Sequence, residues 1–104
     1  MRVIIGGAGR VGTELAKTLR AEEMDVVLVD SDSRAVKNAQ NLDVLVIHGD
    51  LTTREKLHEA GIGEAEVFVA ATNSDERNLL ACALAEHAHY QYGGSKAKPL
   101  LSIS

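Results

Sequence analysis

The chain opens with Arg2-Val-Ile-Ile-Gly6, which runs directly into Gly7-Ala-Gly-Arg-Val-Gly12. The first stretch has the pattern of a short buried strand, and the second is a G-x-G-x-x-G loop. A helical pattern of apolar residues follows, and then a second apolar run, residues 26–29, ends in Asp30. A lone glycine loop is weak evidence, but here a strand, a helix and an acidic residue flank it in the required order. This combination predicts a site for a dinucleotide or for the phosphates of a nucleotide.

Each residue of this pattern has a physical role in such a site. Gly7 lets the chain turn tightly out of the strand, Gly9 lets backbone N–H groups approach a pyrophosphate, and Gly12 lets the helix pack closely. The helix N-terminus offers unpaired N–H groups and a partial positive charge to phosphate. The carboxylate of Asp30 can accept hydrogen bonds from both ribose hydroxyls. It would also repel a 2′-phosphate, which disfavours NADP despite the nearby Arg34.

Composition and charge exclude several other classes of protein. The net charge of −4 and the 3% aromatic content argue against a nucleic-acid-binding surface. The single cysteine, Cys82, cannot form an internal disulfide and fits a reducing compartment. No apolar run approaches the roughly 20 residues that span a bilayer, and the first strand does not resemble a signal peptide. We therefore expect a cytoplasmic protein with one domain over residues 1–104.

Apolar runs alternate with helical patterns along the whole chain. Five strands are expected, at residues 2–6, 25–30, 44–47, 67–71 and 99–103. Because these runs are continuous, both faces of the sheet should be covered by helices. The prediction is an α/β, Rossmann-like, doubly wound parallel sheet with strand order 3-2-1-4-5. Ligands bind such sheets at the carboxyl ends of the strands, where the strand order reverses, so residues 30–32, 49–51 and 71–73 should join the glycine loop.

The starts and buried faces of the helices can also be predicted. Thr52 and Glu55 form a capping box for the third helix, which Gly61 should end. Asn73 or Ser74 should cap the fourth helix. In the first helix, Val11, Leu15 and Leu19 form one narrow apolar stripe, and the small residues Ala8, Gly12 and Ala16 lie on the adjoining rows, where the helix should meet the sheet. The expected buried side of the fourth helix consists of Leu79, Leu80, Ala83 and Leu84.

Several polar residues have two interpretations. Asp32 and Asp50 could touch a ligand or could cap the next helix or turn. Asn78 could contact the ligand or be solvated or locally bonded. The pair His87 and His89 could suggest a metal site, but residues two apart on a helix do not face one direction. A solvated helix end is the better interpretation of that pair, and Cys82 is expected to be packed rather than reactive.

The residues quoted so far resemble a known family, the regulatory nucleotide-binding domain of potassium transport systems, called the RCK or KTN domain. The resemblance covers nearly the whole chain. The glycine loop carries the family's Arg after its second glycine. The most specific match is the run from residue 69 through Asn78 to Cys82, since general dehydrogenases share the glycines but not this run. The other matching stretches are residues 27–32, 48–52 and 57–62.

The resemblance implies a role for each matching position. The glycine loop would hold phosphates, with Arg10 placed to reach a terminal phosphate, and Asp30 would hold the ribose. Asp50 and Leu51 would flank the adenine, and residues 71–73 would line the far side of the cleft. The predicted cofactor-binding residues are Gly7, Ala8, Gly9, Arg10, Val11, Gly12, Asp30, Ser31, Asp32, Gly49, Asp50, Leu51, Ala71, Thr72 and Asn73. No catalytic or metal-binding residue is predicted.

Family members bind NAD(H) or ATP/ADP without chemistry on the ligand, and the sequence does not choose between these ligands. The resemblance implies a homo-oligomeric, dimer-based ring that gates a membrane-embedded potassium transporter or channel from the inner face of the membrane. The chain departs from the family in having no Arg in residues 100–103 and a long loop over residues 90–98. The alternative is the cofactor-binding half of an NAD-dependent oxidoreductase, which the glycine loop and Asp30 fit equally well. Against that alternative, the sequence shows no substrate domain and no convincing set of catalytic residues.

Overall fold

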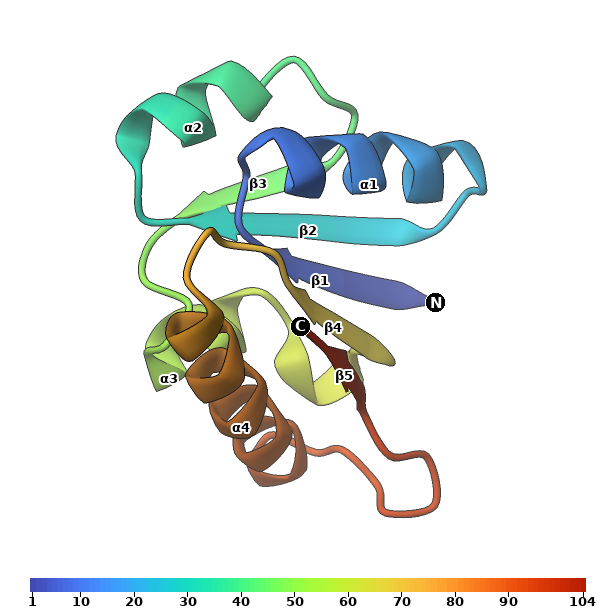
Figure 1. The fold of residues 1–104 in the computed structure, drawn as a ribbon. Helices are drawn as coiled ribbons and strands as arrows, with labels where there is room; N and C mark the ends of the chain where they lie inside the picture. Colours follow the sequence, from blue (N-terminus) through green and yellow to red (C-terminus); the bar gives the residue numbers. More distant parts are fainter.

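Five parallel strands form one sheet, and the sheet positions everything else in the molecule (Figure 1). The computed structural model describes all 104 residues, Met1–Ser104. The strand order is β3-β2-β1-β4-β5, as predicted. The strands are β1 (Arg2–Gly6), β2 (Asp25–Asp30), β3 (Leu45–His48), β4 (Val67–Ala70) and β5 (Leu101–Ile103). The strand order reverses between β1 and β4, so the carboxyl ends of these two strands mark the expected ligand edge.

Helices cover both faces of the sheet, which confirms the doubly wound prediction (Figure 1). One face carries α1 (Arg10–Ala21) and α2 (Ser33–Ala39). The other carries α3 (Arg54–Glu59), the short 3-10 helix η1 (Ile62–Glu64) and α4 (Asp75–Gln91). Gly61 follows α3 with a φ of 83°, so the predicted glycine does end that helix.

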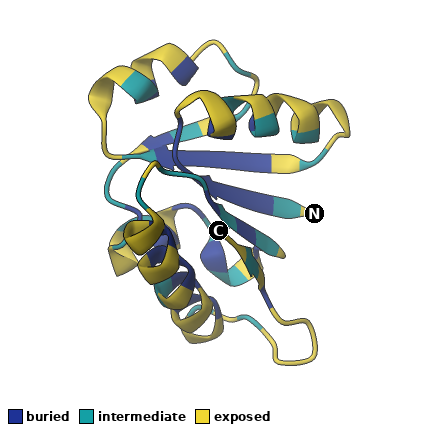
Figure 2. Ribbon diagram, viewed as in Figure 1, coloured by how far each residue is buried: buried dark blue, intermediate teal, exposed yellow.

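The apolar runs of the strands supply two separate cores. Ile4 of β1 belongs to the larger core, which packs against α3, η1 and α4. Val3 and Ile5 point to the opposite face and belong to the smaller core beneath α1 and α2. Alternate side chains of a strand point to opposite faces, so a strand that is buried on both faces must be apolar at every position. Figure 2 shows the central strands buried and the outer helix faces exposed.

The predicted buried face of α4 is wrong. Leu79 is 66% exposed and Leu80 is 51% exposed, Ala83 is exposed, and only Leu84 packs partly against the core. The side that faces the sheet consists mainly of small residues: Asn78, Ala81, Cys82, Ala85 and Ala88. Small side chains let the helix lie close to the strands, and this close packing outweighs the greater hydrophobicity of the leucines. The burial of Cys82 is as predicted.

In α1 the predicted packing is confirmed except at Val11. Val11 is 68% exposed, because Gly12 and Ala16 face the sheet. Leu15 and Leu19 are partly buried against the smaller core. The small residues therefore meet the sheet as predicted, and only Val11 of the predicted apolar stripe lies outside the packed face.

Two predictions about helix ends also need correction. Thr53, and not Thr52, caps α3, and its hydroxyl accepts a hydrogen bond from the Lys56 N–H at 3.4 Å. Thr52 instead bonds to Asp50 in the preceding turn, which delays the helix by one residue. Ser74, one of the two predicted candidates, caps α4.

His89 does not lie at a solvated helix end. The helix α4 continues to Gln91, and His89 is only 3% exposed. Its Nδ1–H donates to the carbonyl of Ile62 at 2.7 Å, and this bond ties the end of α4 to η1. The residue is part of the packing between α4 and η1.

Candidate functional site

Two of the three motif glycines are required by the fold itself. Gly7 has a φ of 125°, and a Cβ there would lie 2.7 Å from the carbonyl oxygen of Ala71. A Cβ on Gly12 would collide with the carbonyl oxygen of Gly7. Both glycines therefore allow the strand, the loop and α1 to pack closely, which any tight strand-to-helix connection of this shape would need.

Gly9 differs from the other two glycines because nothing in the protein requires it. Its φ is −80°, which any residue adopts, and a Cβ on it would meet no atom within 4 Å. The space beside Gly9 is open, as a backbone that approaches a phosphate closely would need. This is the observation that best fits a bound phosphate group.

The N-terminus of α1 is the only α-helix start in the chain without a side-chain cap. The helices α2, α3 and α4 are capped by Asp32, Thr53 and Ser74. In α1 the N-cap is Gly9, and the first turn carries no acidic residue. The first N–H groups of α1 therefore remain available, and together with the helix dipole they favour an anion at this point.

Asp30 fixes the glycine loop from the end of β2. One carboxylate oxygen accepts a hydrogen bond from the Ala8 N–H at 2.8 Å, and the other accepts one from the Asp32 N–H at 2.8 Å. Asp30 is therefore more than a solvated strand end. Each oxygen can accept a further hydrogen bond, so the carboxylate can still receive ribose hydroxyls.

A cleft of about 440 Å³ lies over these groups at the carboxyl edge of the sheet. Eleven of the fifteen predicted residues line it: Gly7, Gly9, Arg10, Val11, Asp30, Ser31, Asp32, Leu51, Ala71, Thr72 and Asn73. The other four, Ala8, Gly12, Gly49 and Asp50, lie outside the lining. Asp32 caps α2, which confirms that interpretation, and it also lines the cleft, where its contact with a ligand stays a prediction.

Sequence reasoning missed two lining residues, Ala35 and Arg77. Arg77 lies three residues after the Ser74 cap, in the first turn of α4. The first turn of a helix that begins at the carboxyl edge of the sheet is near the ligand edge, and this signal could have identified Arg77.

The loop between β4 and α4 is shaped by Asn78. Its side-chain oxygen accepts a hydrogen bond from the Thr72 N–H at 3.1 Å, and its Nδ2 donates to the Thr72 carbonyl at 3.1 Å. Asn78 is only 6% exposed. The locally bonded interpretation is confirmed, and the side chain holds the wall of the cleft in place.

Asp50 lies beside the cleft in the turn between β3 and α3. Its Oδ1 accepts hydrogen bonds from the Thr52 N–H at 2.9 Å and the Thr52 hydroxyl at 2.6 Å, and pairs with Arg77 Nη2 at 3.2 Å. The Thr52 side-chain bond is the main cause that holds the pKa of Asp50 below its ordinary value of 3.8, and Arg77 adds to it. Asp50 is thus a carboxylate at neutral pH.

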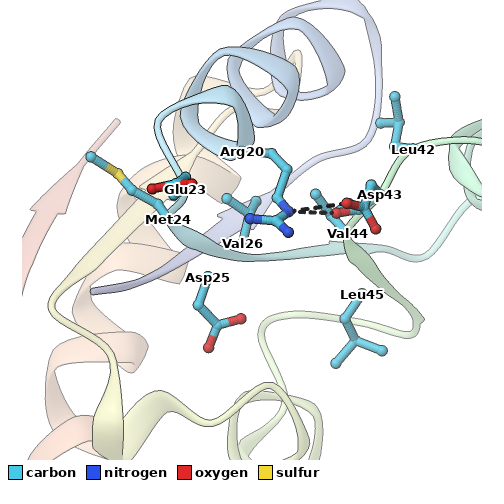
Figure 3. Close-up of a pocket in the computed structure, with 9 residues that line it drawn as sticks. All are labelled: Arg20, Glu23, Met24, Asp25, Val26, Leu42, Asp43, Val44 and Leu45. Atoms are coloured by element: carbon cyan, nitrogen blue, oxygen red, sulfur yellow. Dashed lines mark hydrogen bonds and ion pairs between the residues drawn. The ribbon is translucent and has the colours of Figure 1, made fainter.

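A second hollow of about 450 Å³ opens at the opposite, amino edge of the sheet (Figure 3). Its most prominent cation, Arg20, is already paired, since its Nε lies 3.1 Å from the Asp43 carbonyl oxygen and 3.3 Å from Asp43 Oδ2. No glycine lines this hollow. It has neither the backbone nor the free charges of a phosphate site.

Comparison with known proteins identifies relatives of this chain. A family model described as the TrkA-N domain matches residues 3–94. A Trk system potassium uptake protein TrkA homolog from Methanothermobacter thermautotrophicus is 48% identical over 85 residues, which cover 81% of this chain and 39% of that protein. The Trk system potassium uptake protein TrkA of Vibrio alginolyticus is 41% identical over 86 residues, covering 82% of this chain and 19% of that protein. The chain thus spans well under half of the length of these relatives.

Solved structures share the fold. The Kef CTD of Shewanella denitrificans in an AMP-bound form superimposes with a TM-score of 0.73 and 27% identity, covering 99% of this chain and 57% of that one. The TrkA-N domain of the inner membrane protein ybaL from Escherichia coli gives a TM-score of 0.69 at 15% identity, covering 99% of this chain and 85% of that one. The UDP-glucose 4-epimerase of Thermus thermophilus, in complex with NAD, gives a TM-score of 0.70 at 21% identity, covering 88% of this chain and 34% of that one.

None of the helices combines the length and the apolar composition that a membrane-spanning segment requires.

Proposed function

The chain belongs to the TrkA-N domain family, and from that premise we propose that it is a nucleotide-binding regulatory domain of a potassium transport system. The observation that carries the proposal is the open space beside Gly9 at the uncapped start of α1. The fold does not need a glycine there, whereas a phosphate does. We propose NAD(H) or ATP/ADP as the ligand, because these nucleotides share the ribose and phosphate groups that Asp30 and the start of α1 would bind.

The residues of the cleft would divide the ligand between them. The N–H groups at the start of α1 would bind the phosphates, and Arg10 would reach a terminal phosphate. Asp30 would use its remaining acceptor capacity for the ribose hydroxyls. Leu51 and Ala35 supply apolar surface in the lining. The ligand would contribute binding energy and no chemistry.

Regulation would follow from unequal binding. A ligand shifts an equilibrium between two conformations only if it binds one of them more tightly. We propose that the two conformations belong to a homo-oligomer of this domain, in which the dimer is the basic unit. We further propose that this assembly gates a membrane-embedded potassium transporter or channel at the inner face of the membrane. The names of the relatives from Methanothermobacter and Vibrio support the potassium partner.

Calorimetric titration of the chain with NAD, NADH, ATP, ADP and NADP tests the proposal. We expect binding of at least one of the first four and weaker binding of NADP, because Asp30 repels a 2′-phosphate. Incubation of the bound nucleotide should leave it unchanged. Absence of binding to all five would refute the proposal. Steady consumption of NAD(H) with a small substrate would instead support the cofactor-binding half of an oxidoreductase.

A further inference from the structure

Arg77 joins two walls of the cleft by a contact that is easily broken. Its backbone N–H donates to the Ser74 hydroxyl oxygen at 3.2 Å, so the residue is fixed at the start of α4. Its side chain is 49% exposed and reaches Asp50, which belongs to the turn between β3 and α3. Exposed ion pairs of this kind contribute little to stability. The guanidinium can therefore leave Asp50 at small cost.

Asp50 does not depend on Arg77. The two hydrogen bonds from Thr52, at 2.9 and 2.6 Å, are shorter than the 3.2 Å contact with Arg77, and all three meet the same oxygen, Oδ1. If the guanidinium moved away, the carboxylate would keep both Thr52 bonds and its exposure to water. Arg77 makes only this one side-chain hydrogen bond, although a guanidinium has five N–H donors. Most of its donors are therefore free within reach of the cleft.

The charges around the cleft are divided by location. The carboxylates of Asp30 and Asp32 lie at the end of β2 and the start of α2. The cations Arg10 and Arg77 lie at the starts of α1 and α4, and both line the cleft. Arg10 makes no ion pair within the chain, so neither cation is strongly held by a carboxylate. A nucleotide with its ribose at Asp30 and its phosphates beside α1 would share this one cleft with both arginines.

We infer that Arg77 exchanges Asp50 for the phosphate chain of a bound nucleotide, and so makes the cleft favour ATP and ADP over AMP. The inference rests on the proposed nucleotide site and assigns it a second phosphate-reading residue. A guanidinium binds phosphate through two parallel N–H bonds, which is stronger than its single contact with a carboxylate oxygen that already accepts two hydrogen bonds from Thr52. Binding would also remove the link between α4 and the turn before α3.

The test compares AMP, ADP and ATP affinities by calorimetry in five variants, one of them a control, and in the unaltered chain. The measured quantity is the phosphate preference, defined as the Kd for AMP divided by the Kd for ATP. Arg77→Gln should lower this preference by roughly tenfold or more, and Arg77→Lys by less, because it keeps the charge but loses the fork. Asp50→Asn should raise the preference by up to about fivefold, because it removes the competitor for Arg77. The double variant Asp50→Asn with Arg77→Gln should match Arg77→Gln alone.

Arg54→Gln is the matched control. Arg54 is an exposed arginine at the start of α3 that makes no ion pair and does not line the cleft. Arg54→Gln removes the same unit of charge as Arg77→Gln, so the phosphate preference should stay unchanged in this control if the effect of Arg77 is local. Binding of all three nucleotides with an unaltered preference in Arg77→Gln would overturn the inference and leave the proposed function intact. Absence of nucleotide binding by the unaltered chain would refute the proposed function, and the inference with it.

Discussion

Replacement of Gly9 by aspartate should move stability and nucleotide binding in opposite directions. Gly9 is the N-cap of α1, with an extended backbone that aspartate adopts readily, and its missing side chain would enter open space. Aspartate is a better N-cap than glycine by a few tenths of a kcal/mol. Its charge also interacts favourably with the helix dipole, and it reduces the entropy of the unfolded chain.

These terms add to a gain of about 1 kcal/mol in the free energy of unfolding. For a chain of this size that gain corresponds to a rise of about 4 °C in Tm. Binding should respond in the opposite way. A carboxylate about 4 Å from a phosphate at a protein surface is repelled by about 4 kcal/mol, so the affinity for any adenine nucleotide should fall by up to about a thousandfold.

Thermal unfolding followed by circular dichroism measures the first effect, and calorimetric titration measures the second. Gly9→Asn is the control, because it adds the same bulk and a similar cap without the charge. It should gain most of the stability and lose less affinity than Gly9→Asp. The reasoning would be refuted if Gly9→Asp bound nucleotide as tightly as the unaltered chain. It would also be refuted if the variant unfolded at a lower temperature, since the space beside Gly9 would then not be free.

Three further predictions concern the site and the packing. Asp30→Asn should weaken adenine nucleotide binding by about 1.5–3 kcal/mol in calorimetry. It should also lower Tm, because the carboxylate accepts a hydrogen bond from the Ala8 N–H. Unchanged affinity would mean that the ribose binds elsewhere. The pKa of Asp50 lies below its unfolded value of 3.8, so the stability that this carboxylate contributes is present at pH 7 and is lost as the pH falls through the folded value. In urea titrations, the difference in the free energy of unfolding between the unaltered chain and Asp50→Asn should therefore shrink from pH 7 to pH 3. A constant difference would contradict this. Leu79→Ser should change the free energy of unfolding by less than about 0.5 kcal/mol, whereas Ala85→Leu should cost about 1–3 kcal/mol through overpacking, and equal melting curves for the two variants would show that the face of α4 is assigned wrongly.

The sheet and the ligand edge were predictable because local rules determine them. Continuous apolar runs require burial on both faces, and alternation with helices requires parallel strands and crossovers. The strand order then follows from the glycine loop, which places β1 at the point of reversal. Because loops at one edge of a parallel sheet converge, eleven of the fifteen predicted residues line one cleft.

The buried face of α4 and the start of α3 were predicted wrongly, because both depend on distances between residues that a sequence does not contain. Hydropathy predicts burial of Leu79 and Leu80, but α4 packs on the sheet mainly through small side chains such as Ala81 and Ala85. The start of α3 moved by one residue because Asp50 competes for Thr52. The first outcome depends on how closely the helix packs on the sheet, and the second depends on which partner lies within hydrogen-bond distance.

The two hydrogen bonds to Asp30 bear on which part of the chain would move when a nucleotide binds. Because both oxygens are already held by the Ala8 and Asp32 N–H groups, the carboxylate that we propose for the ribose is preorganised, and little entropy would be lost in orienting it on binding. That side of the cleft acts as a rigid reference for the bound nucleotide. The displacement that distinguishes the bound from the free state should then be concentrated on the opposite wall, where α4 begins. Chemical-shift changes on nucleotide binding should accordingly extend further along α4 than along α2.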